Sequence, residues 1–121
     1  MDLLVPSPLD AYYAAVDAGD AEAATATFTD DGLYIRPSLV EPGTLELVRG
    51  HDDLLEFFRK RGNPPFRHEV VACAYDGPRC FVEGVAYVHG EPTTSFLVHA
   101  NIADDGRIRR YFALMGDLAP G

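Results

Sequence analysis

Arg36 stands near the end of the segment FTDDGLYIRP (residues 28–37), where apolar and polar residues alternate. Leu33 and Ile35 would form one face of a short strand, and Tyr34 and Arg36 the other, because successive side chains of a strand point to opposite sides. If the second face lines a pocket, the guanidinium needs an acidic partner or an anionic ligand, and it forks well onto a carboxylate. A local bulge would instead turn Arg36 to the rim or the surface.

Two cysteines, Cys73 and Cys80, flank a predicted turn at Asp76-Gly77. A symmetric hairpin would place them opposite each other, close enough for a disulfide. The N-terminus lacks a basic region followed by an apolar core, so no secretory signal is visible and a cytoplasmic location is expected. Reduced, packed thiols are therefore predicted. Two cysteines without clustered histidines do not form a zinc site, and no metal is predicted.

The elements that must position these residues begin with helices. Ser7 reads as the N-cap of a first helix, which stops at Gly19, and Asp20 caps a second short helix. A third helix is predicted over residues 51–61 (HDDLLEFFRKR), which carry acids in the first turn and bases in the last.

Strands follow. LELVRG (45–50) favours a short strand, and the NPP sequence after the third helix predicts an extended turn. From Phe66 onward, four runs rich in β-branched and aromatic residues are separated by DGP, HGEP and DDG. Close spacing without intervening helices predicts an antiparallel meander. Helices first and a sheet afterwards indicate an α+β fold whose sheet can wrap around the helices.

Composition limits the possible partners. The chain has 121 residues, which suits a single domain over residues 1–121. Its net charge of −9 opposes binding to phosphate backbones, so no nucleic-acid partner is expected. No apolar stretch approaches the ~20 residues that a membrane span needs, so no membrane partner is expected either.

Four segments together resemble the nuclear transport factor 2-like (NTF2-like) superfamily, and within it the SnoaL-like proteins: YYAAVDAGD, FTDDG, LVRGHDDLLEFF and DDGRI. The resemblance covers roughly residues 8–118. It implies a cone-shaped, cystatin-like α+β barrel with a mostly apolar cavity that holds a small-molecule ligand without a cofactor. It also implies a homodimer through the outer face of the sheet. The superfamily includes steroid isomerases, polyketide cyclases, epoxide hydrolases, dehydratases and non-catalytic carriers, so fold alone does not settle function.

The resemblance also implies site positions. The tyrosine donor of the steroid isomerases falls on Tyr12, and Tyr13 lies about 100° further round the helix, so only one of the two is expected to point inward well. The carboxylate base of those enzymes falls on Arg36 and their second donor on Val98, and an arginine cannot abstract a proton. The general acid of the polyketide cyclases falls on Tyr111, a poor proton shuttle at neutral pH. The epoxide hydrolases of the superfamily use an Asp-Arg-Asp set to activate water. The sequence offers an arginine for this set, but no two carboxylates can be placed beside it.

Strand alternation supplies a candidate partner for Arg36 inside such a cone. With Cys80 inward, a period of two turns one set of residues toward the cavity: Val82, Gly84 and Ala86 on the same strand, and Cys73, Val71, Glu69 and Arg67 across the hairpin. Glu69 could then pair with Arg36 and serve as the proton acceptor. The small residues of the expected lining would leave room for a ligand.

Two histidines have defined parities on the predicted strands. If Phe96 and Val98 face the cavity, His99 faces the dimer interface, which is favoured over a role as catalytic base, although that role stays open. His68 falls on the outer parity of its strand and is predicted to lie outside.

Enzyme and binding module are the two leading function classes. The enzyme would be a cofactor-independent isomerase, cyclase, dehydratase or hydrolase acting on a small, largely apolar molecule. Its catalytic candidates are Tyr12, Arg36, Glu69, His99 and Tyr111, and its ligand contacts Tyr34, Phe57, Val82, Phe96, Val98, Ala113 and Met115. The alternatives are a module that binds such a ligand, acids included, without turnover, and a structural homodimer with a filled cone. An empty cavity with a carboxylate or imidazole near Arg36 would favour the enzyme.

Overall fold

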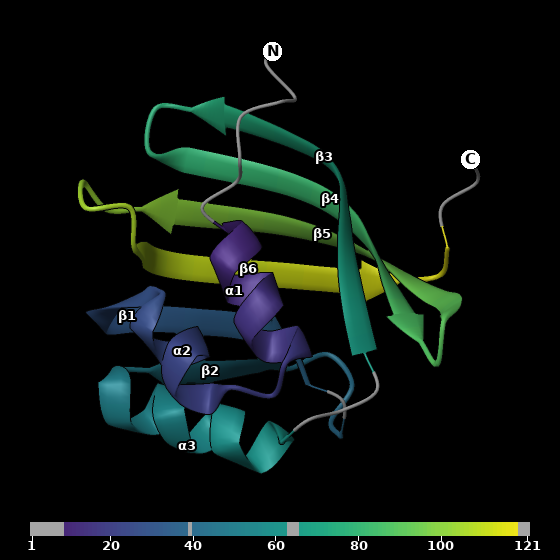
Figure 1. The fold of residues 1–121 in the computed structure, drawn as a ribbon, viewed down its shortest axis with the longest axis horizontal. Helices are drawn as coiled ribbons and strands as arrows, with labels where there is room; N and C mark the ends of the chain where they lie inside the picture. The colour runs from purple at the N-terminus through teal and green to yellow at the C-terminus, as the bar shows by residue number, and fades with distance from the viewer. Residues whose placement is uncertain (1–8, 39, 63–65, 119–121) are drawn as a thin grey trace.

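The centre of the molecule is a six-stranded sheet in the order β2-β1-β6-β5-β4-β3 (Figure 1). The computed structural model describes residues 9–38, 40–62 and 66–118. Its strands are β1 (Phe28–Pro37), β2 (Leu45–Arg49), β3 (Phe66–Asp76), β4 (Arg79–Val88), β5 (Glu91–Ile102) and β6 (Ile108–Gly116). Neighbours pair antiparallel except β1 and β6, which are parallel. The predicted α+β fold and meander are confirmed.

The helices are α1 (Leu9–Asp17), α2 (Ala21–Ala26) and α3 (His51–Arg61). In Figure 1, α1 crosses in front of the sheet, with α2 and α3 below it. Asp20 caps α2 as predicted, because its Oδ1 accepts the Ala23 N–H at 3.0 Å. The predicted cap at Ser7 and the predicted turn at 63–65 lie outside the described residues. Among the helices of the described part, none is long and apolar enough to cross a membrane.

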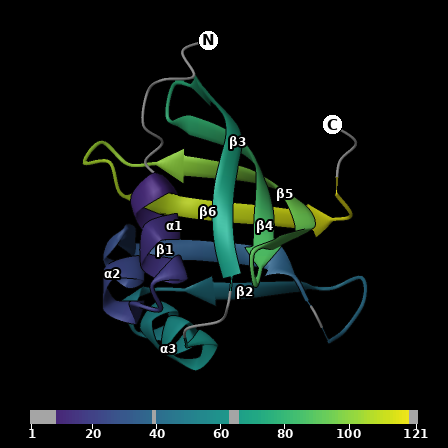
Figure 2. The same cartoon turned by 45° about the vertical axis from the view of Figure 1, so that its right-hand side comes forward.

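β3 bends so that its first half crosses the front of the sheet, in both Figure 1 and Figure 2. Its pairing with β4 shifts between Val70 and Ala72, which leaves Val71 as the extra residue of a β-bulge. Because one inserted residue reverses the parity of a strand, His68 and Val70 face inward before the bulge. The predicted inward positions of Arg67, Glu69 and Val71 are therefore wrong, and so is the outward position of His68.

The hairpin between β3 and β4 turns one residue later than predicted. Asp76 pairs with Arg79, so the turn is Gly77-Pro78, with Gly77 at φ +59. Cys73 consequently lies opposite Val82 rather than Cys80. Both cysteine side chains are buried, as predicted, and their Sγ atoms are 3.7 Å apart.

Gly84 faces inward as predicted, but it leaves no room for a ligand. The Phe96 ring of β5 lies directly over it: a Cβ at Gly84 would fall 2.1 Å from Phe96 Cζ and 2.7 Å from the Glu69 carbonyl oxygen. Glycine is thus required here by the close approach of an aromatic ring and a neighbouring backbone. The interior space must come from elsewhere in the cone.

Candidate functional site

A cavity of about 680 Å³ opens on the concave side of the sheet. Its volume lies within the range of small-molecule pockets, so the cone is hollow. The lining combines apolar with ionisable side chains, namely Tyr12, Tyr34, Arg36, Glu46, Phe57, Lys60, Arg61, Phe66, His68, Thr94, Phe96, Tyr111, Ala113 and Met115.

Most of the predicted site residues lie in this lining: Tyr12, Tyr34, Arg36, Phe57, Phe96, Tyr111, Ala113 and Met115. Val82 and Val98 face the same side but are buried in the core and are not part of the cavity wall. The lining includes several residues that sequence reasoning did not identify. Among these, His68, Glu46, Lys60 and Arg61 are the ones that carry or accept charge.

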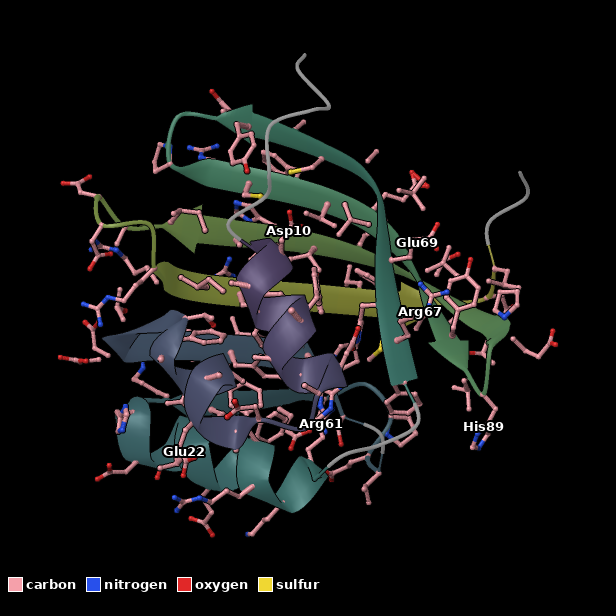
Figure 3. All side chains as sticks on the ribbon, viewed as in Figure 1. Asp10, Glu22, Arg61, Arg67, Glu69 and His89 are labelled. Carbon is pink, nitrogen blue, oxygen red and sulfur yellow. The ribbon has the colours of Figure 1, made fainter. Side chains whose placement is uncertain are left out.

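Glu69 and His99 lie away from the cavity. The Glu69 side chain is 49% exposed and its Oε2 is 3.6 Å from Arg67 Nη1 (both labelled in Figure 3), so it is neither the partner of Arg36 nor an interior proton acceptor. The His99 ring stacks on Phe81 on the convex face, with centroids 5.0 Å apart. Its outward orientation is the one that its parity predicted.

Arg36 points inward, as predicted, with a side chain that is 19% exposed. Its Nε donates to Glu46 Oε2 at 2.9 Å, and its Cζ lies 5.0 Å from the centre of the Phe57 ring. Glu46 is the residue of β2 directly opposite Arg36. Burial opposes the charged form, but Tyr34 and Glu46 outweigh it and raise the pKa of Arg36. The guanidinium is therefore a fixed, partly neutralised charge in the cavity wall.

A cluster of tyrosines forms the floor of the cavity. The hydroxyls of Tyr13 and Tyr111 are 3.1 Å apart, and the ring of Tyr34 stacks on that of Tyr111 with centroids 5.2 Å apart. Tyr12 packs 5.0 Å from Tyr111, again between ring centroids. Burial raises the pKa of Tyr12, Tyr13 and Tyr111, so these phenols are neutral hydrogen-bond donors at neutral pH.

Both neighbouring tyrosines of α1 are buried, contrary to the expectation that only one could point inward. α1 has packing partners on two sides, which is the physical reason. Tyr12 meets Phe28 edge-on at 5.6 Å, whereas Tyr13 stacks on His68 of the bent strand β3 at 5.1 Å. The bend of β3 thus supplies a second buried face for the helix.

His68 forms a dyad with Asp17. Its Nδ1 is 2.5 Å from Asp17 Oδ1, and its backbone N–H donates to Asp17 Oδ2 at 2.8 Å. The two side chains are 14% and 21% exposed. Burial lowers the pKa of His68, against the opposing effect of Asp17, so the ring is neutral at pH 7.

The arrangement fixes which ring nitrogen of His68 carries the proton. A carboxylate accepts, so Nδ1 is the donor and Nε2 is left with a lone pair. Within the described residues Nε2 has no hydrogen-bond partner, and His68 lines the cavity. The dyad therefore places an imidazole with a free acceptor nitrogen in the lining of the cavity.

The position of Asp17 in the sequence indicates that it has a partner, although the sequence analysis did not identify it. It ends α1, and the last turn of that helix has no basic residue. A carboxylate is unfavourable there, because the helix dipole places negative charge at the C-terminus. β3 is the last strand of the sheet, so the His68 N–H on its open edge is available to Asp17.

A hollow α+β cone with a tyrosine-lined cavity defines the class as NTF2-like. Within that class the chain belongs to the SnoaL-like domain family, whose model matches residues 9–111. The resemblance read from the sequence is thereby confirmed. A search of curated proteins found no match.

Solved structures share the fold at low sequence identity. An NTF2-like protein of unknown function from Burkholderia xenovorans is 22% identical, covers 94% of this chain and 85% of its own, and has a TM-score of 0.71. A proposed isomerase of the SnoaL-like family from Agrobacterium tumefaciens is 13% identical, with coverages of 90% and 94% and a TM-score of 0.73. A protein with a ketosteroid isomerase-like fold from Catenulispora acidiphila, solved in complex with trimethylamine, is 14% identical, with coverages of 89% and 84% and a TM-score of 0.72.

Proposed function

We propose that this protein is a cofactor-independent enzyme that transfers a proton on a small, largely apolar molecule held in the cavity, in the manner of an isomerase, cyclase, dehydratase or hydrolase. One observation carries the proposal: the His68–Asp17 dyad faces an unfilled cavity of about 680 Å³ that Arg36 and tyrosine hydroxyls also line. An imidazole in an empty pocket is the feature that separates an enzyme from a module offering donors alone.

His68 is the proposed general base, and it then returns the proton as the acid. A neutral imidazole whose pKa lies below its ordinary value accepts a proton through Nε2 at pH 7. Asp17 has the role of a positioning residue: it holds the proton on Nδ1 and stabilises the imidazolium that forms. Neither residue lies at the carboxylate-base position of the steroid isomerases, which Arg36 occupies.

The proposed donors to the negative charge that develops on the substrate are Tyr12, Tyr111 and Arg36. Neutral phenols and a fixed guanidinium aimed into a desolvated site stabilise an oxyanion without reorganising. Tyr111 is held by the hydroxyl of Tyr13, and Arg36 by Glu46. These contacts give the donors fixed geometry before the substrate enters.

The test is proton exchange on carbon acids. Wild-type protein is incubated in D₂O with a panel of small cyclic and aryl ketones, and loss of the α-proton signals is followed by NMR. We expect exchange above buffer, reduced by about 10²- to 10⁴-fold in His68→Gln, the range of a general base. The matched control is His99→Gln, which should exchange at the wild-type rate. If the wild type binds the ketones but does not exchange their α-protons, the enzyme proposal is wrong and the protein is a non-catalytic carrier.

We also propose a homodimer through the convex face of the sheet. Phe81, Leu97 and Leu114 are 42%, 58% and 47% exposed there and border a shallow groove of about 390 Å³. Beside them, His99 Nε2 is buried with no hydrogen-bond partner in the described part of the chain. Light scattering should give twice the chain mass for the wild type and the chain mass for Leu97→Glu. A monomeric wild type would overturn the dimer and leave the cavity proposal standing.

A further inference from the structure

Arg61 is placed at the cavity by the register of α3. The helix buries Leu54 and Phe58 against the rest of the molecule, and Arg61 continues the same face at a spacing of three residues. Its neighbours Arg59 and Lys60 are largely exposed to solvent, with side chains 59% and 78% exposed. In Figure 3, the Arg61 nitrogens lie near the C-terminal end of α1.

Arg61 lacks the acidic partner that the other basic residues of the cavity have. Arg36 is paired with Glu46 at 2.9 Å, and Lys60 with Glu56 at 3.1 Å. Within the described residues no ion pair involves Arg61, whose guanidinium lies 5.9 Å from the centre of the Phe66 ring. Among the acidic side chains of the described residues none forms an ion pair with this half-buried cation, whose charge at the cavity is only partly solvated.

The charge of Arg61 acts on the residues that we propose as the base and the hydrogen-bond donors of the reaction. It acts to lower the pKa of His68, Tyr12 and Tyr111, although burial is the larger influence on each. Arg61 lines the same cavity as His68, Tyr12 and Tyr111, so an anion bound to Arg61 would share that cavity with the dyad and the tyrosine floor. A guanidinium favours carboxylates in particular, because its planar fork matches their two oxygens.

We propose that Arg61 binds a carboxylate of the substrate, so that the ligand is a small apolar acid whose hydrocarbon part lies against Phe57, Phe96 and Met115. This inference rests on the cavity of the proposed function and names its substrate class. The site for the anion is Arg61 rather than Arg36, because the charge of Arg36 is already met by Glu46.

The experiment measures the preference for a carboxylate over an uncharged analogue. Isothermal titration compares arylalkanoates of increasing length, from phenylpropionate to naphthylbutyrate, with the matching primary amides. For the best acid we expect the wild type to bind about tenfold or more tightly than its amide, the scale of a charged hydrogen-bonded contact. Arg61→Gln should bind acid and amide equally, and Arg61→Lys should keep part of the preference. Arg59→Gln, two residues away on the same helix and with a side chain 59% exposed, is the matched control and should keep all of it.

The outcomes separate this inference from the proposed catalysis. A wild type that binds no acid better than its amide, or an Arg59→Gln variant that loses the preference as fully as Arg61→Gln, overturns the carboxylate site. A melting temperature close to the wild type verifies that each variant is folded. His68→Gln should retain the acid preference while losing proton exchange. If the preference depends on Arg61 but no exchange occurs in the wild type, the carboxylate site stands and the catalytic proposal fails.

Discussion

The two faces of the sheet each carry a histidine stacked on an aromatic ring. The two histidines differ in the hydrogen-bond partners of their ring nitrogens. On the concave face, His68 stacks on Tyr13 and is held by Asp17. On the convex face, His99 stacks on Phe81 at nearly the same centroid distance, but its Nε2 is buried without a hydrogen-bond partner among the described residues.

This contrast separates the features that make a base from those that only bury a ring. Stacking is common to both faces, so it is not diagnostic. Both rings also border an open volume, of about 680 Å³ for His68 and about 390 Å³ for His99. The concave face adds an acidic residue at the end of a helix, Asp17, which holds the His68 ring. The convex face offers an apolar surface, which suits a second protein chain better than a substrate.

The largest effect on stability is expected from filling the concave face at Gly84. Gly84→Ala places a Cβ against the Phe96 ring and the Glu69 carbonyl, and overpacking of this kind costs about 1–3 kcal/mol. Gly116→Ala is the matched control, because a Cβ there meets nothing within 4 Å. Urea unfolding should separate the two variants. Equal midpoints would mean that the concave face tolerates added volume.

A smaller effect is expected when His68 is made more like His99 by removal of the charge on Asp17. Asp17→Asn keeps an acceptor for the backbone N–H but weakens the contact to Nδ1, at a cost of about 1 kcal/mol in the free energy of unfolding. In the His68→Gln background the same change should cost less, because the ring contact is already gone. A double-mutant cycle measures the difference. Equal costs in both backgrounds would contradict the dyad.

The smallest effect is a dependence of stability on pH. The pKa of folded His68 lies below the unfolded value of about 6.5, so the unfolded chain binds the proton first as pH falls. The stability contributed by neutral His68 is fully present above about pH 6.5 and is lost as pH falls through the folded pKa. Urea midpoints from pH 8 to 5 should fall more steeply for the wild type than for His68→Gln. Parallel curves would show that His68 does not titrate with a shifted pKa.

The elements of the fold could be predicted because each has a local signal. Asp20 and Gly62 mark helix ends, and glycine-containing turns separate the strands of the meander. The parity of β4 was also predictable up to Ala86, because its pairing with β5 is regular there. Alternation placed Arg36 on the face opposite Leu33 and Ile35, and the resemblance to the SnoaL-like proteins predicted that this face is the inner one.

The partners of the ionisable residues could not be predicted from the alternation of side chains along a strand. They depend on a β-bulge, on strand register and on contacts between residues far apart in the sequence. One inserted residue at Val71 exchanged Glu69 for His68 on the concave face. The partner of Arg36 is Glu46, whose register depends on the loop between β1 and β2. Asp17 meets His68 across 51 residues of sequence, and only its unfavourable place at a helix end pointed to a role.

The state of the His68 ring tests the account most directly, and it requires no substrate. Nitrogen-15 NMR of histidine-labelled protein, assigned with His68→Gln, reports which ring nitrogen carries the proton and the pH at which the ring titrates. We predict a proton on Nδ1, a free Nε2 at pH 7, and a midpoint below the ordinary value of about 6.5. A proton on Nε2, or a midpoint at or above that value, would contradict this prediction.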